Sequence, residues 1–66
     1  MEILVNGGKK QVSDGITVLG VLKELSYESP HLAVAVNHAC VPRSQFESYE
    51  INEGDDIEIL APMSGG

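Results

Sequence analysis

The sequence has little cysteine and histidine, and this shortage excludes several kinds of site. It contains one cysteine, Cys40, and two histidines, His31 and His38. A single cysteine cannot form an internal disulfide, and a metal framework needs two paired clusters of ligands. We therefore expect no metal site, and in particular no iron–sulfur cluster of the four-cysteine kind. Cys40 is expected to be a small buried apolar residue rather than a nucleophile, since only His38 is close enough in sequence to act as its base.

Basic residues are scarce as well, and this shortage excludes polyanionic partners. Four lysines and arginines stand against ten aspartates and glutamates, so the formal net charge is −6. Phosphate backbones and anionic lipid surfaces repel such a chain, so we expect neither a nucleic-acid nor a membrane partner. The acids of the later part of the chain are Glu47, Glu50, Glu53, Asp55, Asp56 and Glu58. They form either a solvated face or a surface that steers the chain toward a basic patch on a partner protein.

Long apolar runs and a secretory signal are also missing. Residues 32–36 are typical of the longest apolar runs, and residues 1–3 lack the basic and apolar regions of a signal peptide. We therefore expect a cytoplasmic location. A chain of 66 residues makes one domain and is too short to enclose a deep pocket. It is thus expected to serve a larger enzyme, with no catalytic residue of its own.

The first half of the sequence predicts a hairpin followed by one helix. Residues 2–12 have a strand-like pattern interrupted by Gly7-Gly8, which supply a turn. Residues 18–25 carry an i, i+3, i+4, i+7 apolar stripe after Thr17, a good helix-capping residue. Gly20 weakens this helix by about 1 kcal/mol relative to alanine, so the helix needs to pack against a sheet.

The second half predicts short strands separated by turns. A strand at 33–37 has two alanines, which are expected to leave room for the helix lying over it. The segments that follow are a turn at 38–39, a return at 40–41, an irregular or single-turn segment at 42–46, a short edge strand at 49–51, a turn at 52–56 and a final strand at 57–61. The economical arrangement is an α+β domain over residues 1–61, in which a mixed sheet of four to five strands curls around one helix.

The apolar pattern also predicts the core. Its expected members are Ile3, Val5, Val18, Val21, Leu22, Leu25, Val34, Val36, Ile57 and Ile59. Phe46 is expected to join them, the alternative being an exposed contact for a partner. Arg43 is expected to tether the irregular segment to a carboxylate or a backbone carbonyl, the alternative being an exposed charge.

The residues after the last predicted strand form a flexible tail, 62–66, with the sequence Pro62-Met63-Ser64-Gly65-Gly66. Pro62 cannot donate to a sheet ladder and so stops the strand before it. Gly65 and Gly66 lack a Cβ, so the Gly-Gly end fits a channel too narrow for side chains. Five extended residues reach roughly 16 Å, which lets the Gly66 carboxylate enter an active site on a partner protein. The alternative is an incidental terminus of small residues.

Several short motifs together resemble a known family over essentially the whole chain. The motifs are Ile3-Leu4-Val5-Asn6-Gly7, Thr17-Val18 with Leu22, Ala35-Val36-Asn37, Val41-Pro42-Arg43, Glu53-Gly54-Asp55 and Ser64-Gly65-Gly66. In this order they resemble the ubiquitin-like β-grasp fold, and within it the ThiS/MoaD family of sulfur carriers, ThiS most of all. Asn37 with Val41-Pro42-Arg43 is the more diagnostic part.

The resemblance implies a non-enzymatic sulfur carrier of thiamine (thiazole) biosynthesis. In such carriers a ThiF-type, E1-like adenylyltransferase uses ATP and Mg to adenylate the terminal carboxylate, which maps to Gly66. A sulfur donor protein then converts it to a thiocarboxylate, which donates sulfur to a ThiG-type thiazole synthase. The resemblance implies no bound cofactor, and it assigns Pro62, Met63, Ser64 and Gly65 to docking of the tail.

Two other functions fit the same residues. The tail also resembles the proline-bearing end of MoaD, the small subunit of molybdopterin synthase, so a MoaD-like subunit is one alternative. A ubiquitin-like interaction module without sulfur chemistry is the other, and it is favoured if the tail can be deleted without loss.

Overall fold

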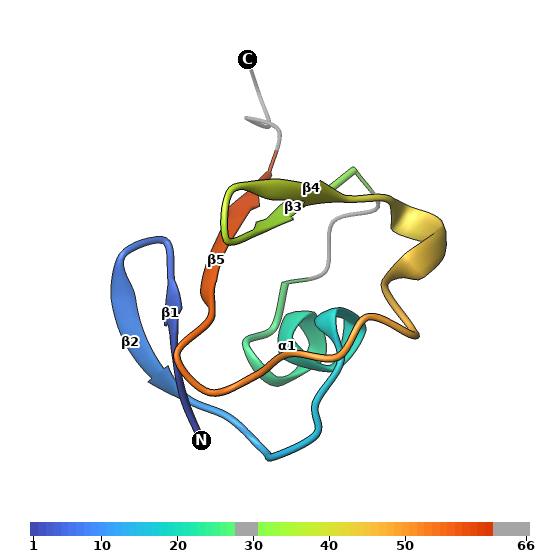
Figure 1. The fold of residues 1–66 in the computed structure, drawn as a ribbon. Helices are drawn as coiled ribbons and strands as arrows, with labels where there is room; N and C mark the ends of the chain where they lie inside the picture. The colour runs from blue at the N-terminus through green and yellow to red at the C-terminus, as the bar shows by residue number, and fades with distance from the viewer. Residues whose placement is uncertain (28–30, 62–66) are drawn as a thin grey trace.

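The computed structural model describes residues 1–27 and 31–61, which form five strands, one α-helix and one 3₁₀ helix (Figure 1). In chain order these are β1 (Glu2–Val5), β2 (Gly8–Gln11), α1 (Val18–Glu24), β3 (Ala33–Val36), β4 (Ala39–Val41), η1 (Arg43–Gln45) and β5 (Asp56–Leu60). The predicted tail, 62–66, lies outside the described residues, so its separation from the domain stays a prediction.

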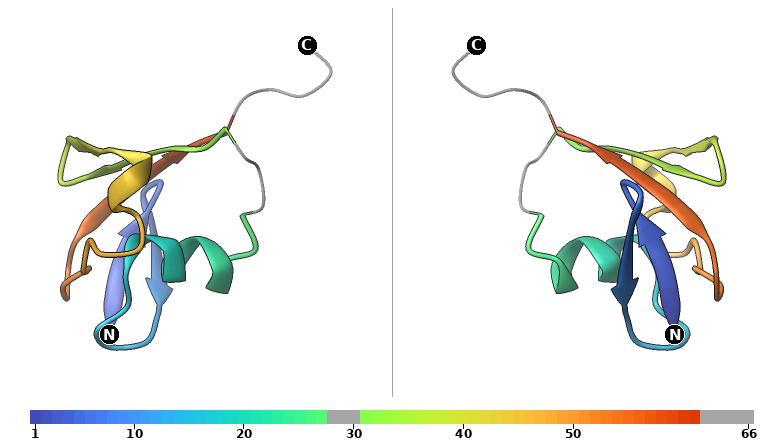
Figure 2. Two further views of the ribbon diagram at one scale, coloured as in Figure 1. Left: turned by 90° about the vertical axis from the view of Figure 1, so that its right-hand side faces the viewer. Right: turned by 90° about the vertical axis from the view of Figure 1, so that its left-hand side faces the viewer.

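The five strands form one mixed sheet in the order β2-β1-β5-β3-β4. The pair β1–β5 is parallel, and the other three pairs are antiparallel. Figure 2 shows α1 against one side of the curved sheet. The predicted α+β architecture, a mixed sheet curled around one helix, is therefore confirmed.

Two tight hairpin turns join the outer strand pairs. The β1–β2 turn is made by Asn6 and Gly7, with φ of 50° and 85°, and the β3–β4 turn by Asn37 and His38, with φ of 51° and 70°. Positive φ at both central residues is the mark of a type I′ turn, which asparagine and glycine favour. The predicted first hairpin is confirmed, with its turn one residue earlier than Gly7-Gly8.

The helix is confirmed at its predicted place, and Gly20 has a packing role. The backbone N–H of Gly20 donates to Thr17 Oγ1 at 3.2 Å, which caps the helix. A Cβ placed on Gly20 would lie 2.6 Å from Ile16 Cγ1. Ile16 is buried, so the missing side chain lets the loop before the helix pack tightly on its first turn.

The core lies between α1 and the facing side of the sheet. All the predicted members are buried except Leu25, which is partly buried against the cluster, and Phe46 is buried as predicted. Buried residues that the prediction left out are Val12, Ile16, Leu32, Val41 and Ile51. Most of them lie in the segments that connect strands and helices, where no periodic apolar pattern indicates which residues are buried.

Two local predictions are wrong. Residues 49–51 form no strand, since only an isolated bridge joins Glu50 to Thr17. Ile51 nevertheless lies in the core, and its N–H donates to Ile16 O at 2.8 Å, which ties the segment to the loop before the helix. Arg43 is exposed, and its side chain contacts no hydrogen-bond or ion-pair partner among the described residues. The irregular segment is held instead by backbone bonds such as Leu19 N–H to Phe46 O, 2.9 Å.

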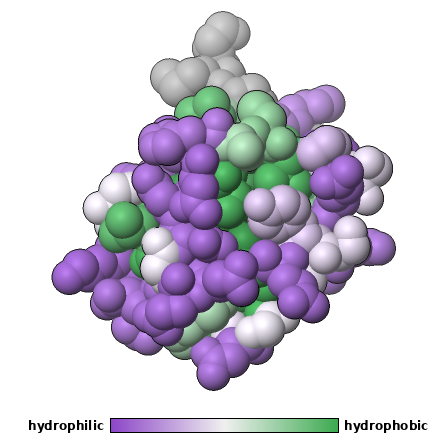
Figure 3. Space-filling view, viewed as in Figure 1, coloured by the Kyte–Doolittle hydropathy of each residue, from purple (hydrophilic) through white to green (hydrophobic). Residues whose placement is uncertain are grey.

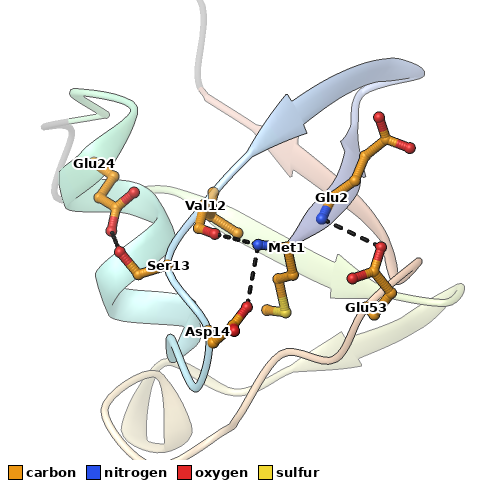
Figure 4. Close-up of polar contacts among 7 residues, drawn as sticks. All are labelled: Met1, Glu2, Val12, Ser13, Asp14, Glu24 and Glu53. Atoms are coloured by element: carbon orange, nitrogen blue, oxygen red, sulfur yellow. Dashed lines mark hydrogen bonds and ion pairs between the residues drawn. The ribbon is translucent and has the colours of Figure 1, made fainter.

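Three contacts hold the amino end of the chain in place (Figure 4). The Met1 ammonium donates to Val12 O at 2.7 Å and lies 3.1 Å from Asp14 Oδ1. Glu53 Oε2 accepts from the Glu2 N–H at 3.3 Å. These contacts hold the start of β1 in the sheet, between β2 and β5.

No helix within residues 1–27 and 31–61 has the length and apolarity needed to cross a membrane.

Candidate functional site

Among the described residues, the one large apolar side chain that is exposed lies at the end of β5. Leu60 is 69% exposed and is the last residue of the strand. Its cross-strand neighbour is Ala33, also exposed. Figure 3 shows apolar surface at the end of the molecule where β5 finishes and further apolar surface toward the middle of this face, among mostly hydrophilic residues. Leu60 with Ala33 thus forms a small exposed apolar surface that is available for contact with a partner.

The side of the sheet opposite the helix continues from Leu60. We call it the outer face; its residues in β3, β4 and β5 are Ala33, Ala35, Cys40, Asp56, Glu58 and Leu60. The alanines of β3 therefore face away from the helix, and the prediction that they make room for it is wrong. Val34 and Val36 take the inner positions, because burying the larger apolar side chain is worth more.

Cys40 is exposed, so the prediction that it is buried is wrong as well. It pairs with Ala35 across the β3–β4 hairpin, and Glu58 pairs with Ala35 from the other side. The side chain of His38 contacts Glu58, with 3.5 Å between Nδ1 and Oε1. Within the described parts of the chain, no group of three or more histidine, cysteine or acidic side chains could hold a metal ion.

The acids that precede and enter β5 are partly structural. Asp55 accepts from Asn37 Nδ2 at 3.1 Å through Oδ1, and from the Asn52 N–H at 2.8 Å through Oδ2. It therefore shapes the turn 52–55 that starts the strand. Glu50, Glu53 and Glu58 are exposed and leave this end of the sheet negative, whereas Lys9 and Lys10 lie on the edge strand β2.

Two asparagines fasten β5, one at each end. At its start, Asn37 Oδ1 accepts from the Asp56 N–H at 3.0 Å. Near its end, Asn6 Oδ1 accepts from the Ile59 N–H at 2.8 Å, and Asn6 Nδ2 donates to Ile59 O at 3.1 Å. Sequence reasoning missed both contacts. The Asn6-Gly7 pair could have indicated the turn, but nothing local indicates a partner 53 residues away.

The predicted site residues themselves, Gly66 and the docking residues Pro62, Met63, Ser64 and Gly65, lie outside the described residues. What the structure gives is the place from which they start, directly beyond Leu60 and Ala61, next to the exposed apolar end of the outer face.

Comparison with known proteins agrees with this architecture. A family model described as the ThiS family matches residues 3–66. The chain is 33% identical to the sulfur carrier protein ThiS of Escherichia coli over 66 residues, which is the whole of both chains. It superposes on the crystal structure of a thiamine biosynthesis protein (ThiS) from Geobacter metallireducens with a TM-score of 0.86 and 28% identity, again over the whole of both chains.

A larger protein also contains a similar segment. The chain is 36% identical over 66 residues to part of a thiazole synthase from Paramagnetospirillum magneticum. The match covers all of this chain and 20% of that protein, so this chain spans about a fifth of its length. The family match through residue 66, the full-length likeness to the Escherichia coli protein and the superposition on the Geobacter metallireducens structure show that the chain belongs to the ThiS family.

Proposed function

We propose that this protein is a sulfur carrier of thiamine biosynthesis whose Gly66 carboxylate is the cargo site. The observation that carries the proposal is the family match, which runs through the Gly-Gly end of the chain. The body supports it, because the last strand ends in an exposed apolar residue immediately before the tail. A carrier of this kind needs a folded domain that a partner can bind and a narrow C-terminal segment that can enter an active site.

The chemistry requires activation of a poor acyl group. A carboxylate resists nucleophiles because of its charge, so a ThiF-type, E1-like enzyme with ATP and Mg would join it to AMP and release pyrophosphate. The acyl adenylate carries a good leaving group. Attack by a sulfide at the Gly66 acyl carbon expels AMP and leaves the thiocarboxylate. Attack by a donor persulfide also expels AMP but leaves an acyl disulfide. A thiol then attacks the donor's sulfur, forms a new disulfide with the donor and releases the thiocarboxylate.

The receiving partner that we propose is a thiazole synthase. Support comes from the thiazole synthase of Paramagnetospirillum magneticum, since one of its segments is similar to this entire chain. A carrier-like segment within that protein suits a reaction in which carrier and synthase must meet. Where the carrier and the synthase are separate chains, they must bind each other through a surface. We assign this contact to the apolar end of the outer face, Leu60 with Ala33.

The acidic residue nearest Leu60 suits the same encounter. Glu50 and Glu53 precede the start of β5, at the opposite end of the strand from Leu60, whereas the exposed Glu58 lies on the outer face two residues before Leu60. A charge beside a docking surface raises the rate of association with a basic partner surface more than it raises affinity. We therefore propose that both partners present a basic residue for Glu58 beside an apolar pocket for Leu60.

Intact-mass measurement tests the carrier role directly. The protein is incubated with its cognate E1-like enzyme, ATP, Mg and a sulfur donor. We expect a mass increase equal to the exchange of one oxygen for one sulfur, with fragment ions that place the sulfur at Gly66. The matched control lacks Gly66 alone, keeps every described residue, and should not load. Sulfur loading of the truncated chain would refute the proposal.

A further inference from the structure

The strand β1 leaves the sheet before β5 ends. The parallel ladder runs from Leu4, whose N–H donates to Asp55 O at 2.9 Å, to Asn6, whose N–H donates to Ile57 O at 2.8 Å. In a regular parallel pair the Asn6 carbonyl would next accept from the Ile59 N–H, and the Gly8 N–H would donate to Ile59 O. Neither bond forms, because the chain turns at Asn6 and Gly7 and Gly8 pairs with Val5 in the hairpin.

The side chain of Asn6 takes the place of both missing backbone groups. Its Oδ1 accepts from the Ile59 N–H at 2.8 Å, and its Nδ2 donates to Ile59 O at 3.1 Å. A carboxamide carries the same acceptor and donor as a peptide unit, so it can extend a ladder by one step. An ionised aspartate or an alanine could not satisfy both groups of Ile59, and an unsatisfied backbone group in a partly buried place is unfavourable.

This step is the last one on the β1 side of β5. The backbone N–H and C=O groups of successive residues in a strand point to alternate neighbouring strands. The backbone groups of Ile57 and Ile59 therefore point toward β1, and those of Glu58 and Leu60 point toward β3. On the β3 side the ladder ends at the pair Leu60–Ala33. The Asn6 carboxamide therefore holds the last residues of β5 on the side that β1 has already left. The residue that it binds, Ile59, is three residues before Pro62.

We propose that Asn6 is a positioning residue for sulfur loading. Through Ile59 it fixes the end of β5, so that a partner bound to the outer face receives the tail from a constant starting point. The inference rests on the carrier role proposed above. It predicts a defect in turnover rather than in docking, because the docking side chain Leu60 stays in place while fewer bound molecules present their tail correctly.

The chain offers a closely matched control in Asn37. Both asparagines occupy left-handed positions of two-residue turns, with φ of 50° and 51°, and both side chains make two hydrogen bonds to β5 or the turn before it. Glycine accepts the same backbone conformation, so Asn6→Gly and Asn37→Gly each delete a carboxamide and keep the turn. They differ in which end of β5 they release.

The experiment compares the full-length parent with Asn6→Gly, Asn6→Asp and Asn37→Gly below the melting temperature of all four. Amide hydrogen exchange reports on the strand, and adenylation by the cognate E1-like enzyme, followed as ATP–pyrophosphate exchange, gives kcat and KM for the carrier. For Asn6→Gly we expect exchange at Ile59 to rise about tenfold, as for the loss of a backbone bond. We expect kcat to fall about three- to tenfold with KM within about twofold.

The two other variants complete the pattern. Asn6→Asp keeps the acceptor for the Ile59 N–H and should recover part of the lost kcat, while Asn37→Gly should keep kcat within about twofold of the parent. Equal kcat losses for Asn6→Gly and Asn37→Gly, or a parent-like kcat for Asn6→Gly, would overturn the proposal. If the parent is not adenylated at all, the carrier role fails, and unchanged Ile59 exchange in Asn6→Gly separately disproves the fastening of the strand.

Discussion

The two faces of the sheet are built from the same strands, but one face packs in the core and the other is exposed. On the inner face, β5 contributes Ile57 and Ile59, both almost wholly buried under the helix. On the outer face the same strand contributes Glu58 and Leu60, both exposed. Alternation along one strand thus separates residues that hold the fold from residues available to a partner. Substitutions at neighbouring positions should therefore separate stability from loading.

The largest effect is expected for Ile57→Ala. Ile57 is 1% exposed and lies at the centre of the core, so its truncation removes buried apolar contacts and leaves a cavity. We expect unfolding free energy to fall by about 2 to 5 kcal/mol, measured by urea denaturation. The matched outer-face change one position on, Glu58→Ala, should stay within about 0.5 kcal/mol. Similar losses for the two variants would contradict the division between the faces.

Gly20→Ala extends the test to the helix that covers the inner face. Alanine normally favours a helix by about 1 kcal/mol, but here its Cβ would lie 2.6 Å from Ile16 Cγ1. We expect a net loss of about 1 to 2 kcal/mol, because overpacking in a tight core outweighs the helix preference. The control is the same change in an Ile16→Ala background, where the clash is gone and Gly20→Ala should become neutral or stabilising. Thermal denaturation of the four proteins gives the coupling.

Leu60→Ser sharpens the comparison from the outer side. Stability should stay within about 0.5 kcal/mol, since the side chain is already exposed. The KM of the carrier for its activating enzyme should rise at least about fivefold, as for a contact worth about 1 kcal/mol, with kcat retained. Lys10→Ser on the far edge strand serves as the control and should leave KM unchanged. A parent-like KM for Leu60→Ser would remove this leucine from the docking surface.

The smallest effect is expected for Cys40→Ser. The thiol is exposed, so a hydroxyl should be tolerated within about 0.5 kcal/mol. Loading at Gly66 should be unchanged, because the attacking sulfur comes from the donor and the carrier needs no thiol of its own. Mass spectrometry with fragment assignment measures both. Sulfur found on Cys40 of the parent and lost in the variant would indicate a persulfide relay instead of a terminal carrier.

Much of the fold could be predicted because its signals are local. The stripe from Val18 to Leu25 and the alternation in β1 and β5 place the helix and the core strands, and Thr17 marks the helix start. In β3 the predicted core members Val34 and Val36 are correct, but the expectation that the alanines face the helix is not. Both faces of Ala33-Val34-Ala35-Val36 are apolar, so the pattern alone does not show that the alanine face is open to solvent, and the exposure of the neighbouring Cys40 was missed for the same reason.

The parts of the site that were missed depend on distant contacts. The partner of Asn6 is 53 residues away, and the role of Asp55 depends on a turn from another hairpin. Ile16 and Leu32 are buried although they lie just outside regular elements, since they cover the open ends of the core. The assignment of Gly66 came from composition and resemblance, and it remains a prediction.

The position of β5 in the sheet has a consequence for the order of folding. β5 is the last strand along the chain and the middle one in space, and it alone joins the pair β1–β2 to the pair β3–β4. Both hairpins can form early, because their contacts are local. They join into one sheet only when β5 pairs with β1 and β3, and such long-range pairing slows folding. During synthesis the sheet therefore cannot be completed until β5 has left the ribosome, and a chain interrupted before residue 56 should remain two unconnected hairpins and be open to proteolysis.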